Sequence, residues 1–221
     1  MVNKSFYNNL VNELTNKVVR LVAVSKTKSV EEIKELYDLG QRIFGENKVQ
    51  EILAKKPLLP DDIEWHLIGT LQTNKVKQII SHVSLIHSVS SISLLQEIEK
   101  RSESLGITSN ILLQIHIAQE ETKHGFTHAE LANLFESGTL QKLTNTKIRG
   151  LMGMASFTDD VEIVKNEFSG LKHLFDTLKA THFPQAEFNV LSMGMSGDYQ
   201  LAIECGANMV RIGSLLFGAR N

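Results

Sequence analysis

Short apolar runs rich in β-branched residues recur along the chain, and the first four begin near residues 20, 42, 63 and 85. Runs of this length, bounded by polar segments, are typical of buried strands. A period of about 22 residues is long enough for one strand, one helix and two short loops. The eight candidate strands are residues 20–25, 42–46, 63–69, 84–89, 110–117, 147–155, 187–194 and 209–218.

The intervals between these runs carry apolar residues at helical spacing. Ser29 with Glu32, and Thr127 with Glu130, have the spacing of a capping box, in which two side chains satisfy the free amides at a helix start. A longer apolar stripe over residues 168–178 predicts the longest of these helices. A further stripe precedes the first strand and predicts an additional helix there: Phe6, Leu10, Leu14 and Val18.

Strands that alternate with helices predict a parallel sheet, because parallel neighbours need long crossover connections. An open dinucleotide-binding sheet would carry a glycine-rich turn after the first strand, and residues 24–29, VSKTKS, contain no glycine. Eight strand candidates in an unbroken rhythm favour closure. We therefore expect a single domain over residues 1–221, a (β/α)8 TIM barrel with an extra N-terminal helix.

The overall composition narrows the function classes. Hydrophobic residues make up 42% of the 221 residues and charged residues 22%, as in an ordinary globular protein. Lys plus Arg number 23 against 25 Asp plus Glu, so no strong field favours nucleic acid or an acidic membrane. A single cysteine indicates a reducing compartment, and no apolar run suits a signal peptide or a membrane span. We expect a cytoplasmic protein.

Barrels of this kind bind ligands at the carboxyl ends of their strands, and phosphates commonly at the loops after strands seven and eight. Small residues there let backbone amides approach an anion. The two loops supply five such residues: Gly194, Ser196, Gly197, Gly213 and Ser214. The plainer alternative is that Ser196 only caps the following helix and that the glycines only turn the chain.

Two lysines follow the first candidate strand. Side chains two positions apart on a strand share a face, so Lys26 and Lys28 are expected to point toward one mouth. A like charge and partial burial both favour the neutral amine, which is the form that attacks a carbonyl. A lysine beside a phosphate cradle suggests a phosphorylated aldehyde held as a Schiff base. The alternative is that Lys26 is an ordinary solvent-exposed lysine at the end of the strand.

A set of motifs, in matching order from about residue 5 to the C-terminus, resembles one known family. The motifs are LVAVSKTK (21–28), FGENKVQE (44–51), WHLIGTLQTNKVK (65–77), HSVSS (87–91), LLQIHIAQEETKHGF (112–126), RGLMGMA (149–155) and LSMGMSGDYQLAIECGANMVRIGSLLFGAR (191–220). Together they resemble the YggS/PROSC family, the pyridoxal 5′-phosphate (PLP) homeostasis proteins, whose fold is similar to the N-terminal domain of alanine racemase.

The resemblance implies a cofactor, PLP, and a role for each matching residue. It implies that Lys26 carries PLP as a Schiff base. Ser196, with backbone groups of Gly213 and Ser214, would hold the phosphate, and Arg211 would face the pyridine nitrogen.

The resemblance also implies that Asn47 lies near the ring and its phenolic oxygen. Lys28 and Lys123 match further family lysines near the site, with roles left open. The family often has proline at residue 29, where this chain has serine, and the capping box explains how the helix starts without it.

The predicted site limits the chemistry. Arginine does not give up its proton, so Arg211 would donate to an unprotonated ring nitrogen and weaken the electron sink of PLP. Racemisation would still need an acid–base group on each face of the substrate. The three tyrosines of the chain do not fall at strand ends: Tyr7, Tyr37 and Tyr199.

We therefore expect no catalytic residue set and no metal site, and His66 is interpreted as a hydrogen-bonded wall residue. The leading interpretation is a monomeric PLP carrier that buffers and delivers the cofactor, with PLP-dependent apo-enzymes as acceptors. A low-activity amino-acid racemase using Lys26, or a barrel for another phosphate ligand, are the alternatives.

Overall fold

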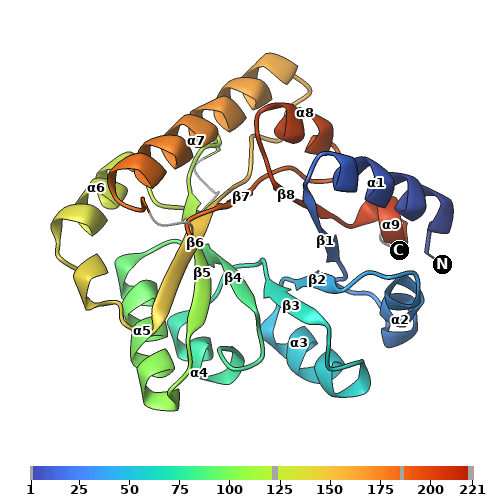
Figure 1. The fold of residues 1–221 in the computed structure, drawn as a ribbon, viewed down its shortest axis with the longest axis horizontal. Helices are drawn as coiled ribbons and strands as arrows, with labels where there is room; N and C mark the ends of the chain where they lie inside the picture. Colours follow the sequence, from blue (N-terminus) through green and yellow to red (C-terminus); the bar gives the residue numbers. More distant parts are fainter. Residues whose placement is uncertain (1, 121–123, 185–186, 219–221) are drawn as a thin grey trace.

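The computed structural model describes residues 2–120, 124–184 and 187–218. Its eight strands pair in parallel, each with the next along the chain, and β1 pairs with β8, so that the sheet closes into a barrel (Figure 1). The strands are β1 Arg20–Val24, β2 Ile43–Glu46, β3 Glu64–Leu67, β4 Leu85–Val89, β5 Ser109–Ile115, β6 Thr146–Gly153, β7 Val190–Ser192 and β8 Met209–Ile212.

A helix fills every crossover between consecutive strands, and α1 precedes the first of them. The helices are α1 Lys4–Asn16, α2 Val30–Asp38, α3 Val49–Lys55, α4 Val76–Ile79, α5 Ile92–Leu105, α6 His128–Glu136, α7 Val161–Thr181, α8 Tyr199–Glu204 and α9 Ser214–Phe217. The predicted TIM barrel with an extra N-terminal helix is confirmed.

The two final strand candidates are shorter than the sequence pattern suggested. Gly194 has a φ of +91° and turns the chain soon after β7, so that strand keeps three residues. The last apolar run divides at Gly213: its first part is β8, and its second part is α9, where the Phe217 amide donates to the Gly213 carbonyl at 2.9 Å. Periodicity alone cannot separate a short buried strand from a short buried helix.

Both predicted capping boxes are present. The Ser29 hydroxyl accepts from the Glu32 amide at 3.3 Å, while the Glu32 carboxylate accepts from the Ser29 amide at 3.0 Å. Thr127 and Glu130 make the same reciprocal pair at the start of α6. Such caps satisfy amides that have no partner within the helix and contribute about 1 kcal/mol each.

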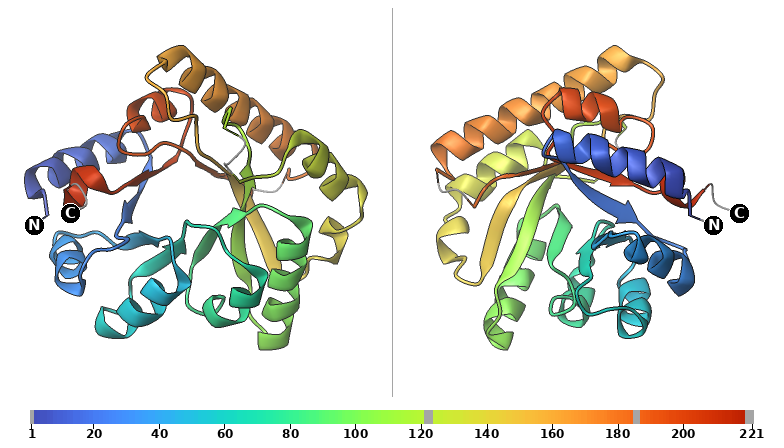
Figure 2. Two further views of the ribbon diagram at one scale, coloured as in Figure 1. Left: turned by 180° about the vertical axis from the view of Figure 1, so that it is seen from behind. Right: turned by 45° about the vertical axis from the view of Figure 1, so that its right-hand side comes forward.

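The outer helices meet where the sheet closes. The Asn3 amide, just before α1, donates to the Leu216 carbonyl in α9 at 2.8 Å. Figures 1 and 2 both show α1 and α9 side by side, next to the β1–β8 edge. The extra helix therefore covers the closing seam of the barrel.

Alternation along the strands divides the buried side chains into two groups. The larger group lies between the sheet and the helices and includes Trp65, Phe44 and Phe168, each at most 1% exposed. A second cluster fills the inside of the barrel: Val22, Leu85, Leu112, Met152, Val190 and Met209. The barrel interior is thus a packed core and not a channel.

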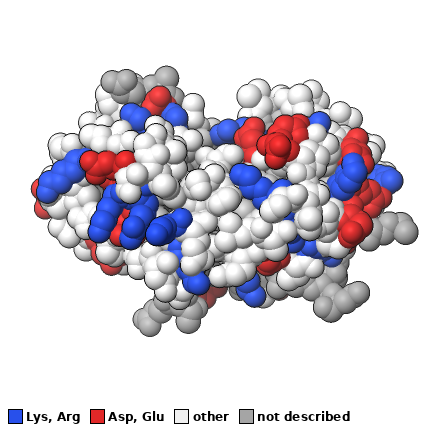
Figure 3. Space-filling view, turned by 90° about the horizontal axis from the view of Figure 1, so that it is seen from below, with Lys and Arg blue, Asp and Glu red and all other residues white. Residues whose placement is uncertain are grey.

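The described part of the chain contains no helix long and apolar enough to cross a membrane. On the face seen in Figure 3, basic and acidic side chains stand close together in two groups, with a broad uncharged area between them. This mixture agrees with the formal net charge of −2.

The close approach of β6 and β7 generates a prediction. A Cβ added to Gly150, whose φ is +151°, would lie 1.8 Å from the Val190 carbonyl oxygen. Gly150→Ala is therefore expected to reduce the free energy of unfolding by at least about 3 kcal/mol, because the strands must separate. Urea unfolding monitored by circular dichroism measures the change.

The matched control is Gly170→Ala in α7, where an added Cβ meets nothing within 4 Å. It is expected to stabilise the protein by about 0.5–1 kcal/mol, because alanine is the better helix former. Equal unfolding midpoints for the two variants would contradict the geometry given for Gly150.

Candidate functional site

One pocket of about 450 Å³ opens at the carboxyl ends of the strands. The predicted residues that line it come from the ends of β1, β2, β7 and β8 and the loops that follow them: Lys26, Asn47, Ser196, Gly197, Arg211, Gly213 and Ser214. Gly194, also predicted for the phosphate cradle, is not part of this lining and serves as a turn residue with a φ of +91°. Residues from distant parts of the chain thus converge on a single cavity. Its volume lies in the range of about 300–1,000 Å³ that holds small ligands.

The loops after β7 and β8 form the polar end of this pocket. The Ser196 hydroxyl accepts from the Gly213 amide at 3.3 Å, which joins the two loops. The helix cap of α8 is Asp198, so the alternative in which Ser196 only caps that helix is wrong. The two loops therefore place the Ser196 hydroxyl, the turn that follows it and the start of α9 at the polar end of the pocket.

Two glycines allow the backbone to pack closely around the pocket. A Cβ on Gly213 would lie 3.1 Å from the Val24 carbonyl oxygen, next to the end of β1. A Cβ on Gly69, after β3, would lie 2.4 Å from the Asn47 carbonyl oxygen. Side chains at these positions would displace the walls that carry Lys26 and Asn47.

The two lysines after β1 do not lie on one face of a strand, as the sequence pattern had predicted. Lys26 and Lys28 both line the pocket, but they lie in the turn after β1 and not on the strand. Lys28 donates from Nζ to the Phe217 carbonyl at 3.0 Å, and its ammonium lies 3.6 Å from the Glu32 carboxylate. Glu32 therefore balances the charge of Lys28, and the prediction that the two lysines share one face of a strand is wrong.

The turn between the two lysines has an unusual backbone. Thr27 has a φ of +65°, in the left-handed region that β-branched residues rarely adopt. Its amide donates to the Glu51 carboxylate at 2.7 Å, and the Lys28 amide donates to the Ser25 carbonyl at 3.0 Å. A conformation of this kind costs about 1–3 kcal/mol and persists only where the surroundings impose it.

A buried ion pair underneath imposes that conformation. Lys55 donates to the Glu46 carboxylate at 2.8 Å, to the Ser25 carbonyl at 3.0 Å and to the Glu51 carboxylate at 2.9 Å. The Ser25 hydroxyl donates to Glu46 at 2.6 Å. Burial raises the pKa of Glu46 to about 7, and the bonds from Lys55 and Ser25 only partly oppose it. No pattern in the sequence indicated this network, although Glu46 directly precedes Asn47.

Arg211 forms part of the pocket wall from inside the barrel. It is 4% exposed and donates to the Ser192 hydroxyl at 2.6 Å and to the Gly153 carbonyl at 3.0 Å. Burial lowers the pKa of Arg211 to about 10, so the guanidinium stays charged at neutral pH. A charged guanidinium can only donate, so any ligand atom that it meets in the pocket must be an acceptor.

No tyrosine is among the described residues that line the pocket. The Tyr7 hydroxyl donates to Gln41 at 3.4 Å, that of Tyr37 donates to Asp62 at 2.7 Å, and Tyr199 is buried in α8. Within the described ranges no group of three His, Cys, Asp or Glu residues is placed to hold a metal ion. Lys123, one of the further family lysines, lies outside the described residues.

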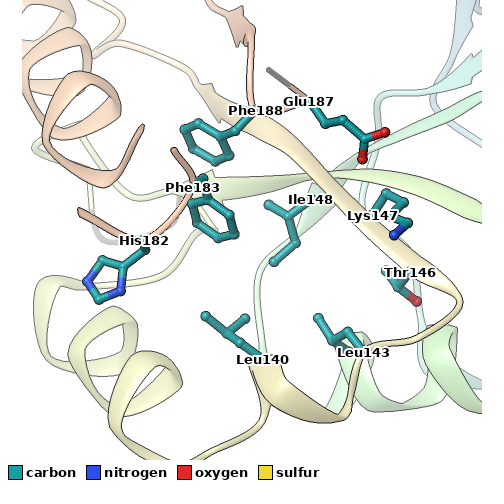
Figure 4. A pocket seen from close by; sticks show the side chains of 9 residues that line it. All are labelled: Leu140, Leu143, Thr146, Lys147, Ile148, His182, Phe183, Glu187 and Phe188. Carbon is teal, nitrogen blue, oxygen red and sulfur yellow. The ribbon is translucent and has the colours of Figure 1, made fainter. Parts of the chain in front are cut away.

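A second pocket, of about 370 Å³, lies on the outside of the barrel near the start of β6 (Figure 4). Its inner wall is Ile148 with the stacked rings of Phe183 and Phe188, whose centroids are 4.5 Å apart. This second pocket lies at the amino-terminal end of β6 and has an apolar wall, whereas the candidate site lies at the carboxyl ends of the strands.

The parallel eight-stranded barrel, with a lysine after β1 and small residues after β7 and β8, belongs by its sequence to the class of alanine-racemase-like barrels. The sequence profile described as "Alanine racemase, N-terminal domain" matches residues 6–221. Two relatives named "Pyridoxal phosphate homeostasis protein" are 44% identical over 202 residues in Helicobacter pylori and 45% identical over 206 residues in Aquifex aeolicus. These alignments cover 90% and 91% of this chain and 87% of each relative. The chain belongs to the family of pyridoxal phosphate homeostasis proteins.

Solved structures agree with this assignment. PipY of Synechococcus elongatus, in a structure with PLP bound, superposes with a TM-score of 0.88 at 35% identity, covering 97% of this chain and 99% of PipY. Alanine racemase of Clostridium difficile superposes with a TM-score of 0.74 at 18% identity and shares the fold. This chain covers 56% of that enzyme.

The raised pKa of Glu46 generates a prediction. Because the folded pKa, about 7, exceeds the ordinary 4.5, the stability from this group is present below pH 4.5 and is lost as the pH rises through 7. Between pH 5 and pH 8 the wild type is expected to lose about 2–3 kcal/mol relative to Glu46→Gln, which cannot ionise. Urea unfolding of both proteins across this range measures the difference.

Glu103→Gln on the exposed surface of α5 is the control, and it is expected to follow the wild type at every pH. An advantage of the wild type over Glu46→Gln that grows with pH would show instead that Lys55 keeps the carboxylate ionised.

Proposed function

We propose that this protein holds PLP as a Schiff base with Lys26 and takes part in PLP homeostasis by buffering and delivering the cofactor. The observation that carries the proposal is the convergence of Lys26, Arg211 and the Ser196–Gly213 cradle on one pocket. The family relatives named for PLP homeostasis and the PLP-bound PipY structure support it.

The residues present fit the chemistry of each part of PLP. The Ser196 hydroxyl and the backbone around Gly213 and Ser214 suit a phosphate, because small residues let amides and hydroxyls approach an anion. Asn47 offers an amide on the wall formed by β2 and Gly69, where a ring hydroxyl would find a partner. Lys26, in the turn across the pocket, supplies the amine.

Arg211 determines how strong an electron sink the cofactor becomes. Bound PLP supplies an electron sink for amino-acid chemistry, and its strength depends on the proton at the ring nitrogen. A donor-only guanidinium pairs with an unprotonated nitrogen and so favours the weak form of the sink. Arg211 is charged and already oriented by Ser192 and Gly153, so this chain favours holding the cofactor over turnover.

Binding through Lys26 is reversible by simple exchange. The amine nitrogen forms a double bond to the aldehyde carbon, its two protons and the aldehyde oxygen leave as water, and another amine can replace Lys26 by the reverse route. Free PLP reacts with any exposed amine, so a reversible imine both protects the cell and keeps the cofactor available. PLP-dependent apo-enzymes are the proposed acceptors, and the proposed carrier is a monomer.

The proposed anchor is tested by reduction and mapping. Purified protein incubated with PLP and reduced with borohydride is expected to carry one pyridoxyl phosphate group on the peptide containing Lys26. Lys26→Ala is expected to lose that adduct and the visible imine absorption. Lys28→Ala, two residues further along the same turn, is the matched control and is expected to keep both. Mass spectrometry of proteolytic peptides identifies the modified lysine.

An adduct on Lys28 or Lys123 in the wild type would make the anchor assignment wrong. A protein that stays colourless and unmodified with added PLP would favour the alternative of another phosphate ligand at the same cradle.

The second candidate function is a low-activity racemase. It is tested because this chain shares its fold with alanine racemase. Racemisation needs an acid–base group on each face of the substrate, and the described pocket lining holds no tyrosine opposite Lys26. We expect loss of α-deuterium from labelled alanine to stay below one event per protein molecule over hours, measured by mass spectrometry. Many turnovers that disappear in Lys26→Ala would establish the enzyme instead.

A further inference from the structure

A row of polar side chains runs through the inside of the barrel, starting at Arg211. Arg211 Nη1 lies 2.6 Å from the Ser192 hydroxyl oxygen, and that oxygen lies 3.1 Å from His87 Nδ1. His87 Nε2 lies 3.0 Å from His66 Nδ1. These residues come from β8, β7, β4 and β3, and each is at most 4% exposed.

The hydrogens in this row can be placed from the chemistry of its first member. Arg211 only donates, so Ser192 accepts from it and has one hydrogen left to donate. Among the described residues the only other partner of that hydroxyl is His87 Nδ1, which must therefore be the acceptor. The reverse arrangement would bury an unsatisfied hydroxyl hydrogen, which is unfavourable.

The direction then continues through both imidazoles. Burial lowers the pKa of His66 to about 3, and burial with the nearby His66, Arg211 and Arg20 lowers the pKa of His87 well below its ordinary value. Both rings are therefore neutral, with one hydrogen each. Since Nδ1 of His87 accepts, its hydrogen is on Nε2 and is donated to Nδ1 of His66, whose own hydrogen is then on Nε2.

The row ends at the opposite face of the barrel from the candidate site. His66 is part of the wall of a polar pocket of about 290 Å³ at the amino-terminal ends of the strands. Arg20, Glu64, Asn110 and Arg149 also line this pocket. Nε2 of His66 has no protein partner within the described ranges, so its hydrogen is available to an acceptor in this pocket.

We propose that Ser192 and His87 are positioning residues for Arg211: a one-way hydrogen-bond chain from Arg211 through Ser192, His87 and His66 fixes the plane in which the guanidinium meets the ligand. Neighbouring hydrogen bonds that point the same way strengthen one another. The role of Arg211 toward PLP rests on the proposed function, whereas the chain itself is a property of the protein alone.

The chain is tested first without cofactor. Nitrogen-15 NMR of the two histidine side chains is expected to find both rings neutral at pH 7 with the hydrogen on Nε2. The guanidinium protons of Arg211 are expected to exchange slowly with solvent. Ser192→Ala removes the link with little change of volume and is expected to alter the His87 tautomer and speed Arg211 exchange at least about tenfold.

Conservative and disruptive changes at His87 separate positioning from packing. His87→Gln keeps an acceptor and a donor on one side chain and is expected to preserve slow Arg211 exchange within about twofold. His87→Leu keeps a similar volume without either group and is expected to behave like Ser192→Ala. Leu112→Met, inside the barrel but outside the chain, is the control and is expected to leave the Arg211 signals unchanged.

Measurements of PLP affinity test whether the chain positions Arg211 for the cofactor. The affinity is expected to weaken about tenfold in Ser192→Ala and His87→Leu and to change little in His87→Gln. A hydrogen on Nδ1 of His87 in the wild type would overturn the direction of the chain. Unchanged Arg211 exchange or unchanged PLP affinity in Ser192→Ala would overturn the positioning role. Failure of the wild type to bind PLP would refute the proposed function alone, because the tautomers and the exchange rates are measured without it.

Discussion

The pairing of β1 with β8 is the constraint on which the site depends. It aligns Leu21 with Val210 and Ala23 with Ile212, and so brings the turn after β1 beside the loop after β8. Lys28 then reaches the carbonyl of Phe217, 189 residues away, across this seam. Lys26 and the loops that carry Ser196 and Gly213 line one pocket only because the sheet is closed, and α1 covers the same seam from outside.

Regular features of the fold could be predicted from the sequence because they are local. The 22-residue rhythm, the capping box at Ser29 and the small residues after β7 and β8 each follow from neighbours in the chain, and the family motifs added Asn47 and Arg211. The end of β7 and the division of residues 209–218 were missed. Both depend on single glycines, Gly194 and Gly213, whose backbone angles periodicity does not report.

The polar groups that support the site could not be predicted from sequence patterns, because their hydrogen-bond partners are far away along the chain. Lys55 is nine residues from Glu46 but also holds Ser25, 30 residues away, and His87 meets Ser192 across 105 residues. The sequence predicted His66 to be a hydrogen-bonded wall residue, and its 3.0 Å contact with His87 fits that prediction, but no sequence pattern named His87 as the partner. No spacing rule links these side chains, since strand order and register bring them together inside a closed sheet.

The left-handed Thr27 has a kinetic consequence. Its turn is already locked by Glu51 and by the Lys55 network, so its conformation does not depend on what the pocket contains. This turn therefore does not have to be ordered when a ligand arrives or released when it leaves. Under the proposed function, this turn adds no conformational step to the making and breaking of the bond at the Lys26 amine.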